Sequence, residues 1–249
     1  MSQFKVVIPA RYASERLSGK PLRDIAGKPM LQHVYERGQE SEAAQVIIAT
    51  DDERIEKAAL AFGADVCMTG ADHQSGTDRL AEVADKLGWP DEQVIVNLQG
   101  DEPMMPAELI NQCAALLDDQ NADVATLASP LAASGDLGNP NIVKVVSDDD
   151  GFALYFSRAS IPYSRAPDTD VLAAETARHH HGIYAYRTGV LRQIVAALPS
   201  AIEKCERLEQ LRAMSIGLRI KVGQPARRPG PGIDTEQDLE EATRLMALR

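Results

Sequence analysis

Short runs of consecutive apolar, mostly β-branched residues alternate with helix-like segments along the first half of the chain. The runs that read as strands cover residues 5–9, 46–50, 65–68, 94–98 and 124–128. The segments between them that read as helices cover residues 29–41, 52–62, 77–87 and 106–118. Apolar runs without polar alternation are typical of parallel strands covered on both faces. This order predicts an α/β fold with a doubly wound, mostly parallel sheet.

The second half of the chain has a different pattern. Residues 143–146 and 152–156 read as two strands joined by a tight turn, because the Asp150-Gly151 step between them supplies the positive φ that such a turn needs. The other predicted elements are a strand at 183–186, a helix at 203–216 that follows a Ser200/Glu203 capping box, a strand at 218–222 and a helix from about Thr235. No change of composition marks a linker. We therefore expect residues 1–249 to form one domain with an antiparallel excursion at about 130–187.

Composition excludes several classes of protein. A chain of 249 residues that is 44% hydrophobic can bury a core without disulfide or metal crosslinks. The net charge of −11 argues against a nucleic-acid partner, and no apolar run reaches the ~18 residues of a membrane span. The N-terminus lacks the pattern of a secretory signal, and the three cysteines form no CxxC pair. These features predict a cytoplasmic protein with reduced thiols.

A basic loop follows the first predicted strand. Residues 10–22 read ARYASERLSGKPL and contain Arg11, Arg16 and Lys20 around Gly19. Ligands of open α/β sheets bind beyond the carboxyl ends of the strands, and three cations on a flexible backbone suit a polyphosphate. The loop has neither GxxxxGK[ST] nor GxGxxG, which excludes a P-loop NTPase and argues against a dinucleotide-dependent dehydrogenase.

Two acids are candidate metal ligands. Asp101 follows the strand at 94–98, at the edge of the sheet that also carries the basic loop, and it could hold Mg²⁺ against phosphate oxygens. Asp234 stands just before the last predicted helix. Its alternative role is a helix cap, beside a Thr235/Asp238 capping box. Spacing alone leaves both roles of Asp234 open.

Two further polar segments could touch a ligand. In a strand, His179 and His181 would share one face, but no third or fourth ligand with zinc spacing is visible. A hydrogen bond from one imidazole to an anionic substrate is the better hypothesis. Residues 72–79 open a helix whose first backbone amides could hold ligand groups, although Ser75 or Thr77 could serve only as a cap.

These segments together resemble the 3-deoxy-manno-octulosonate (Kdo) cytidylyltransferases. The resemblance covers essentially the whole chain in order. It departs at Ser18, where the family usually has proline, and at His181, where the family commonly has an aliphatic residue. The matching stretches are IPARYASERLSGKPL (8–22), GKPM (27–30), ATD (49–51), DHQSGTDRLAE (72–82), NLQGDEP (97–103), NPNIVKVV (139–146), ALYFSRASIP (153–162), HGIYAYR (181–187), LEQLR (208–212) and GIDTEQDL (232–239).

The resemblance implies a role for each matching residue. Binding of CTP falls to Ala10, Arg11, Arg16, Lys20, Ser75, Gly76 and Arg79, with Arg11, Arg16, Lys20 and Asp101 as the catalytic group. The implied magnesium ligands are Asp101 and Asp234. The residues implied to line the sugar-acid pocket are Gln99, Arg158, His180, Tyr184, Glu209 and Gln210.

The resemblance also implies a reaction and partners. A cytidylyl group would pass from CTP to the anomeric hydroxyl of Kdo by in-line displacement, releasing pyrophosphate and giving CMP-Kdo for lipopolysaccharide biosynthesis. The alternative is another acceptor, such as 8-amino-Kdo or a sialic acid. The family further implies a homodimer built on the antiparallel excursion.

Overall fold

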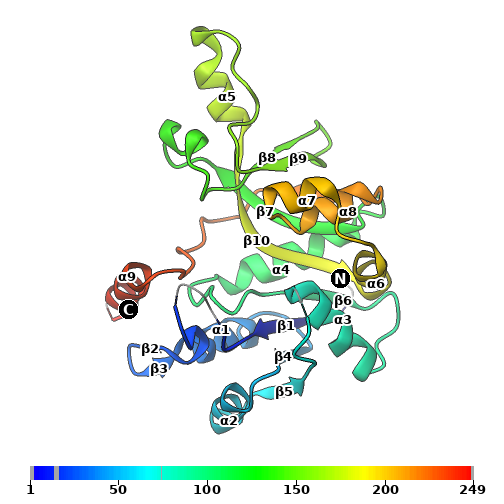
Figure 1. The fold of residues 1–249 in the computed structure, drawn as a ribbon, viewed down its shortest axis with the longest axis vertical. Coiled ribbons are helices and arrows are strands. Elements are labelled where there is room, and N and C mark those ends of the chain that lie inside the picture. The colour runs from blue at the N-terminus through cyan, green and yellow to red at the C-terminus, as the bar shows by residue number, and fades with distance from the viewer. Residues whose placement is uncertain (1–2, 14–16, 74, 248–249) are drawn as a thin grey trace.

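The computed structural model describes residues 3–13, 17–73 and 75–247, and a nine-stranded sheet runs through this part of the chain (Figure 1). Seven strands follow the order β11-β7-β10-β6-β1-β4-β5, and the β8–β9 hairpin pairs with β10. The strands are β1 (Phe4–Ala10), β4 (Gln45–Thr50), β5 (Asp65–Met68), β6 (Val94–Asn97), β7 (Val124–Pro130), β8 (Lys144–Ser147), β9 (Ala153–Ser157), β10 (Arg178–Arg187) and β11 (Ile220–Gly223), with β2 (Asp24–Ile25) and β3 (Lys28–Pro29) in a separate hairpin.

Most of the sheet is parallel, as the sequence predicts. Strands β6, β1, β4 and β5 are parallel neighbours, and β11 runs parallel to β7. Strand β10 lies antiparallel between β6 and β7. Its pairing with β7 shifts between His180 and Tyr184, where Gly182 adopts a φ of +65°. This bulge lets one ten-residue strand serve both the parallel sheet and the excursion.

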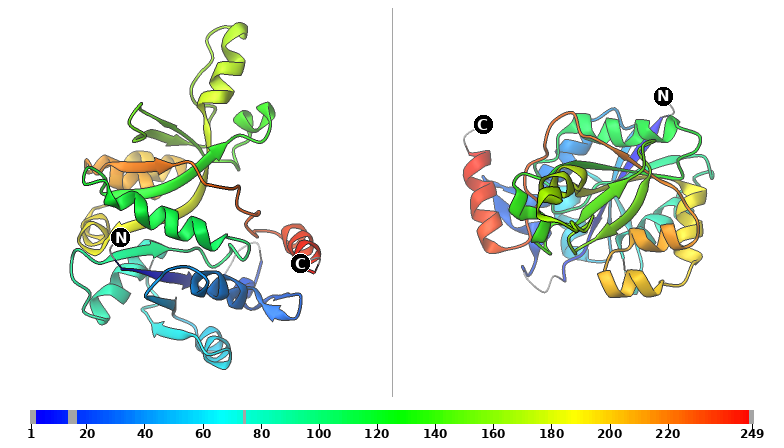
Figure 2. Two further views of the ribbon diagram at one scale, coloured as in Figure 1. Left: turned by 180° about the vertical axis from the view of Figure 1, so that it is seen from behind. Right: turned by 90° about the horizontal axis from the view of Figure 1, so that it is seen from above.

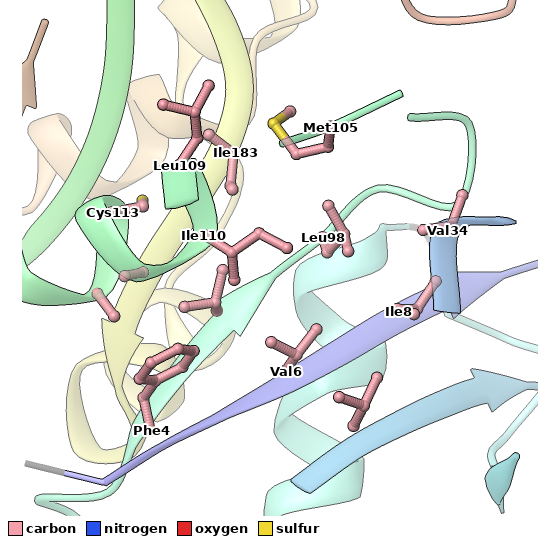
Figure 3. Packing of buried hydrophobic residues seen from close by; sticks show 14 of the residues in the cluster. Phe4, Val6, Ile8, Val34, Leu98, Met105, Leu109, Ile110, Cys113 and Ile183 are labelled. Atoms are coloured by element: carbon pink, nitrogen blue, oxygen red, sulfur yellow. The ribbon is translucent and has the colours of Figure 1, made fainter. Parts of the chain in front are cut away.

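Helices cover both faces of the sheet, so its central strands are buried on both sides (Figure 2). Along β1, Val6 and Ile8 pack into one core with α1, α2 and α4, and Val7 packs into the other with α3, α6 and α8 (Figure 3). Burial on both faces explains why these strands appear in the sequence as continuous apolar runs. The helices are α1 (Met30–Gln39), α2 (Glu53–Ala61), α3 (Gly76–Lys86), α4 (Ala107–Ala115), α5 (Asp170–Thr176), α6 (Thr188–Ala196), α7 (Ala201–Glu206), α8 (Gln210–Ser215) and α9 (Glu236–Met246).

The excursion contains the predicted hairpin. Strands β8 and β9 pair antiparallel, and Gly151 in their connection has a φ of +78°. Helix α5 follows and projects away from the body of the molecule (Figure 1). Near the C-terminus, α9 packs beside β2 over a small third core. Within the described ranges, no helix has the length and apolar character to cross a membrane.

The prediction of one helix over residues 203–216 is wrong. The Ser200/Glu203 capping box is present and starts α7, but Arg207 turns into the left-handed region at φ +53° and ends it. Helix α8 then begins at Gln210. A buried ion pair at 2.6 Å between Arg212 and Glu203 holds the two short helices together. The predicted helix range therefore spans a break that only the backbone dihedral of Arg207 reveals.

Candidate active site

A cleft of about 770 Å³ lies at the edge of the sheet where β1 and β6 end. Four segments line it: the loop after β1, the turn after β6, the start of α3, and the residue that precedes Thr235. They bring together most of the residues predicted for CTP and metal binding, namely Ala10, Arg11, Lys20, Ser75, Gly76, Arg79, Gln99, Asp101 and Asp234. Arg16, which the sequence also places in this group, lies outside the described residues.

The turn after β6 approaches the end of β1 so closely that it requires glycine. A Cβ at Gly100 would lie 2.9 Å from the carbonyl oxygen of Pro9, which is too close for any side chain. Gly100 therefore allows Gln99 and Asp101 to face the basic loop directly. The sequence contains this glycine, but only the pairing of the strands shows that the carbonyl of Pro9 leaves no room for a side chain there.

Lys20 occupies the centre of the cleft's charged wall. Its Nζ donates to Asp101 Oδ2 at 2.8 Å and to Asp234 Oδ1 at 2.9 Å. Burial by itself lowers the pKa of Lys20, but the charges and hydrogen bonds of the two carboxylates outweigh burial and raise this pKa above its usual value. The ammonium is thus a fixed positive charge between two acids that are 133 positions apart in the sequence.

Asp234 faces the cleft, and the helix cap belongs to its neighbour. Thr235 Oγ1 accepts from the Asp238 backbone N–H, and the Asp238 carboxylate accepts from the Thr235 backbone N–H in return. The cap of α9 is therefore complete without the side chain of Asp234. A backbone hydrogen bond of 3.0 Å from Ile233 to the Asp101 carbonyl joins the two acidic segments.

Glu102 lies beside these acids and is partly buried. Burial, followed by the charge of Asp101, raises the pKa of Glu102 well above its ordinary value. Its carboxyl packs against Gly232, where a Cβ would come within 2.8 Å of Glu102 Oε1. Glu102 therefore packs the two acidic segments together.

The opposite wall of the cleft is the start of α3. Ser75 and Asp78 cap this helix reciprocally, each accepting a backbone N–H of the other at 3.2 Å. Arg79 is 4% exposed, hydrogen-bonds to Thr69 Oγ1 and lies 3.3 Å from Asp51. Ser75 therefore acts as the predicted cap and lines the cleft as well, so the two roles are compatible.

A smaller cavity of about 40 Å³ adjoins the cleft, and Gln99 lines both. Its wall contains Tyr184, Glu209 and Gln210, three of the residues predicted to bind the sugar acid. Within the described part of the chain, most of the buried side-chain atoms that lack a hydrogen-bond partner line this cavity: Asn97 Oδ1, Tyr184 OH, Glu209 Oε1 and Gln210 Nε2. Orphaned polar atoms around one small space indicate a site for a polar ligand. Burial is also the main cause that raises the pKa of Glu209.

Arg158 and His180 do not line either cavity. The guanidinium of Arg158 donates to the carbonyl oxygens of Glu206 and Pro140, each at 3.0 Å. His180 is 9% exposed, and its Nε2 lies 3.1 Å from Thr126 Oγ1. Both residues are held by contacts within the protein.

The hydrogen bonds around His180 define its tautomer. Thr126 Oγ1 donates its single proton to the Ile183 carbonyl at 2.6 Å, so His180 Nε2 must be the donor to that hydroxyl. Burial lowers the pKa of His180 to about 3, so the ring is neutral near pH 7. Any contact of this ring with a substrate is that of a neutral imidazole.

The other two histidines of the triplet share a face, as the strand register requires. The rings of His179 and His181 lie 4.8 Å apart, and His181 Nε2 is 2.9 Å from Ser129 Oγ. Among the residues that the structure describes, no group of three or more His, Cys, Asp or Glu side chains is arranged to hold a metal ion.

Sequence reasoning selected none of four other cavity residues: His73 in the cleft, and Thr77, Asn97 and Tyr186 in the smaller cavity. Each stands within a motif that was recognised and one to three residues from a selected position. The alternation of β6 and β10 and the turn of α3 could have indicated which neighbours share a face.

Comparisons with known proteins identify the family of the chain. Residues 5–220 match the family described as Cytidylyltransferase. A 3-deoxy-manno-octulosonate cytidylyltransferase from Idiomarina loihiensis is 52% identical, with 97% of this chain and 98% of the relative covered. One from Halorhodospira halophila is 51% identical, with 99% and 98% covered.

Solved structures give the same result. A CMP:2-keto-3-deoxy-manno-octonic acid synthetase in complex with CTP superposes with a TM-score of 0.91 at 45% identity, covering 99% of each chain. A cytidylyltransferase from Leptospira borgpetersenii shares the fold at a TM-score of 0.65 and 16% identity, covering 99% of this chain and 87% of the other. With half of its residues identical to those relatives over almost its full length, the chain belongs to the cytidylyltransferase family, and within it to the 3-deoxy-manno-octulosonate cytidylyltransferases.

Proposed function

We propose that this protein transfers the cytidylyl group of CTP to the anomeric hydroxyl of Kdo, giving CMP-Kdo and pyrophosphate. The observation that carries the proposal is the adjacency of two spaces that share Gln99. One is a cleft with cationic and acidic walls, and the other is a small cavity ringed by orphaned polar atoms. The first suits a metal-bound triphosphate, and the second suits a hydroxylated acid.

The protein groups would act by position and charge. Arg11 and Lys20 line the cleft and would hold the phosphates, together with the predicted Arg16. Ser75, Gly76 and Arg79 would contact the base and ribose from the start of α3. Direct in-line displacement at the α-phosphorus would account for transfer without a covalent enzyme intermediate.

A magnesium ion fits the two carboxylates. Asp101 and Asp234 both place an oxygen within 3 Å of the Lys20 ammonium, so their oxygens already converge on a cation. Magnesium binds through one or two carboxylates plus substrate phosphates, which is the donor set available here. Bound there, it would neutralise phosphate charge and lower the pKa of the attacking hydroxyl.

The sugar acid would enter beside Gln99. Tyr184, Glu209 and Gln210 offer it hydroxyl, carboxyl and amide groups whose hydrogen-bonding capacity is still free in part. A cavity of about 40 Å³ holds little more than a water molecule, so an eight-carbon acid must enlarge it. We further propose that Arg158 and His180 reach the acceptor after that enlargement.

We also propose a cytoplasmic homodimer joined through the excursion at about residues 130–187. Four large apolar side chains of this segment are exposed, and a monomer would leave them in water: Leu154 (60% exposed), Tyr163 (85%), Val171 (67%) and Leu172 (62%). The test is the mass of the protein in solution, measured by light scattering, for the wild type and for a Tyr163→Glu/Leu172→Glu variant.

Release of pyrophosphate tests the reaction. It should require CTP, Mg²⁺ and Kdo together, with ATP, UTP, N-acetylneuraminate and 8-amino-Kdo as controls. Release with 8-amino-Kdo or N-acetylneuraminate and not with Kdo would move the assignment to that acceptor. Binding of CTP without turnover of any acceptor would contradict the proposed function.

A further inference from the structure

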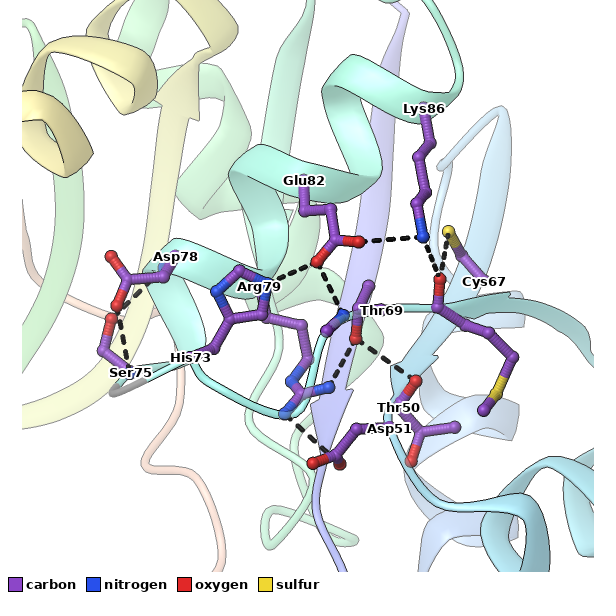
Figure 4. A network of polar contacts seen from close by, with 12 residues as sticks. Thr50, Asp51, Cys67, Thr69, His73, Ser75, Asp78, Arg79, Glu82 and Lys86 are labelled. Carbon is purple, nitrogen blue, oxygen red and sulfur yellow. Dashed lines mark hydrogen bonds and ion pairs between the residues drawn. The ribbon is translucent and has the colours of Figure 1, made fainter.

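The carboxylate of Glu82, on α3, accepts from three donors (Figure 4). Its Oε2 accepts from the Gly70 backbone N–H at 2.8 Å and contacts His73 Nε2. Its Oε1 forms an ion pair at 2.8 Å with Lys86. Glu82 belongs to α3, whereas Gly70 and His73 lie in the loop before this helix. The helix therefore holds residues 70 and 73 of that loop in place.

These contacts keep Glu82 ionised. Burial raises the pKa of this carboxyl, but its hydrogen bonds with Lys86, His73 and Gly70 outweigh burial and lower the pKa to about 2. Hydrogen bonds to a charged acceptor are stronger than neutral ones. The carboxylate therefore holds the loop firmly across the physiological pH range.

The other end of the same loop is anchored separately. The Thr69 backbone N–H and hydroxyl both donate to the Thr50 carbonyl, at 2.8 and 3.2 Å, which ties the loop to the end of β4. Arg79 reaches back from α3 to the Thr69 hydroxyl. Residues 69–73 are thus held at both ends. Contacts with Thr50 and Arg79 hold Thr69, and the contact with Glu82 holds His73.

Glu82 itself does not line the cleft, whereas His73, Ser75, Gly76 and Arg79 do. Any effect of Glu82 on a ligand must therefore pass through these residues, and His73 is the one that it contacts. We propose that Glu82 is a positioning residue for the nucleotide, which holds His73 and residues 69–73 in an arrangement ready for binding. The inference rests on the proposed function, because it assigns this wall of the cleft to CTP.

A substitution series separates positioning from general stability. Glu82→Ala removes both oxygens, and we expect the KM for CTP to rise about tenfold, the scale of losing charged hydrogen bonds, while kcat and the KM for the sugar acid change less than about twofold. Glu82→Gln can keep one oxygen on Gly70 and His73 and turn its amide toward Lys86, so it should restore most of the CTP affinity. Glu82→Asp withdraws the oxygen from His73 and should raise the KM for CTP.

Two further variants complete the test. Asp85→Ala is the matched control, since Asp85 lies on the same helix and forms a 2.8 Å ion pair with Arg192 but does not line the cleft. It should leave all constants unchanged. A His73→Asn/Glu82→Ala double variant should have a KM for CTP no higher than His73→Asn alone, because Glu82 acts through His73.

The outcomes are distinguishable from failure of the proposed function. An unchanged KM for CTP in Glu82→Ala, or in Glu82→Asp should the alanine variant not fold, overturns the positioning role while the wild type still turns over CTP. Equal losses in kcat and in both KM values overturn it as well. If the wild type does not bind CTP in a calorimeter, the proposed function itself fails.

Discussion

The Lys20 ammonium stands 2.8 Å from Asp101 and only slightly farther from Asp234, on the point where both carboxylates converge. A protein cation thus sits where the proposed metal ion would bind. If the proposed metal ion bound to these carboxylates, Lys20 would have to leave one or both of them, and its ammonium could then contact a phosphate. Two of the following predictions depend on this arrangement.

Replacing Asp101 by asparagine should leave the fold intact and reduce kcat by at least about a hundredfold, the cost of losing one preorganised electrostatic contact in an active site. Steady-state kinetics and a thermal melt measure both. Asp119→Asn is the matched control, because Asp119 also pairs with a lysine, Lys221 at 3.0 Å, and does not line the cleft. Full turnover by Asp101→Asn would remove this residue from the metal site.

Replacing Lys20 by methionine should make the nucleotide-free protein bind Mn²⁺ at least about tenfold more tightly, because the ammonium no longer neutralises the two acids. Electron paramagnetic resonance of free and bound Mn²⁺ measures this without any turnover. Lys221→Met, which also removes the partner of an aspartate, should not change the affinity. If the nucleotide-free wild type already binds Mn²⁺ as tightly as Lys20→Met, the lysine does not compete with the metal ion.

Replacing Arg158 by alanine should raise the KM for the sugar acid and hardly alter that for CTP, since a guanidinium is a suitable partner for the acceptor's carboxylate. The melting temperature should also fall by a few degrees, because Arg158 donates to the carbonyls of Glu206 and Pro140. Initial rates at varied concentrations of each substrate provide the comparison. An equal rise in both KM values would count against contact with the acceptor.

His181 should make the protein less stable in mild acid. Burial, and then the neighbouring charges of His179 and Arg228, lower the pKa of His181 to about 3, whereas a histidine in the unfolded chain titrates near 6.5. The stability that this residue contributes is therefore present above pH 6.5 and is lost as the pH falls toward 3. Relative to His181→Gln, the free energy of unfolding of the wild type should fall by about 1.4 kcal/mol per pH unit between about pH 6 and 4.

Urea unfolding at pH 8, 6, 5 and 4 measures that difference. At pH 8 both chains carry a neutral side chain at position 181, and this comparison gives the baseline cost of the substitution. Unfolding free energies that stay parallel down to pH 4 would show that the folded protein protonates His181 as readily as the unfolded chain does.

Most of the sheet could be predicted because its strands are buried on both faces and so appear as unbroken apolar runs. Residues 65–68 even match β5 in both bounds. Helix α6 (Thr188–Ala196) was not predicted, and β10 begins five residues earlier than expected. The early part of β10 contains Arg178 and three histidines, whose polarity hides a strand that gains its partners only from β7 and β8.

The candidate site was predictable to the extent that its residues follow strand ends. Arg11 and Asp101 are placed by the parallel pairing of β1 with β6, which the apolar runs already imply. Asp234 lies in an irregular segment after β11. Such a segment has no hydrophobic periodicity from which its path could be predicted. The internal hydrogen bonds of Arg158 and His180 depend on residues that lie up to 54 positions away in the sequence.

The meeting of Asp101 with Asp234 also means that the sheet and the acidic pair can be lost separately. Among the described residues, every strand of the sheet lies before residue 224, so proteolysis after β11 would leave all of these strands in the chain. It would remove the segment in which Ile233 donates to the Asp101 carbonyl, and Asp234 with it. A chain clipped there that stays folded would therefore keep only one of the two proposed metal ligands.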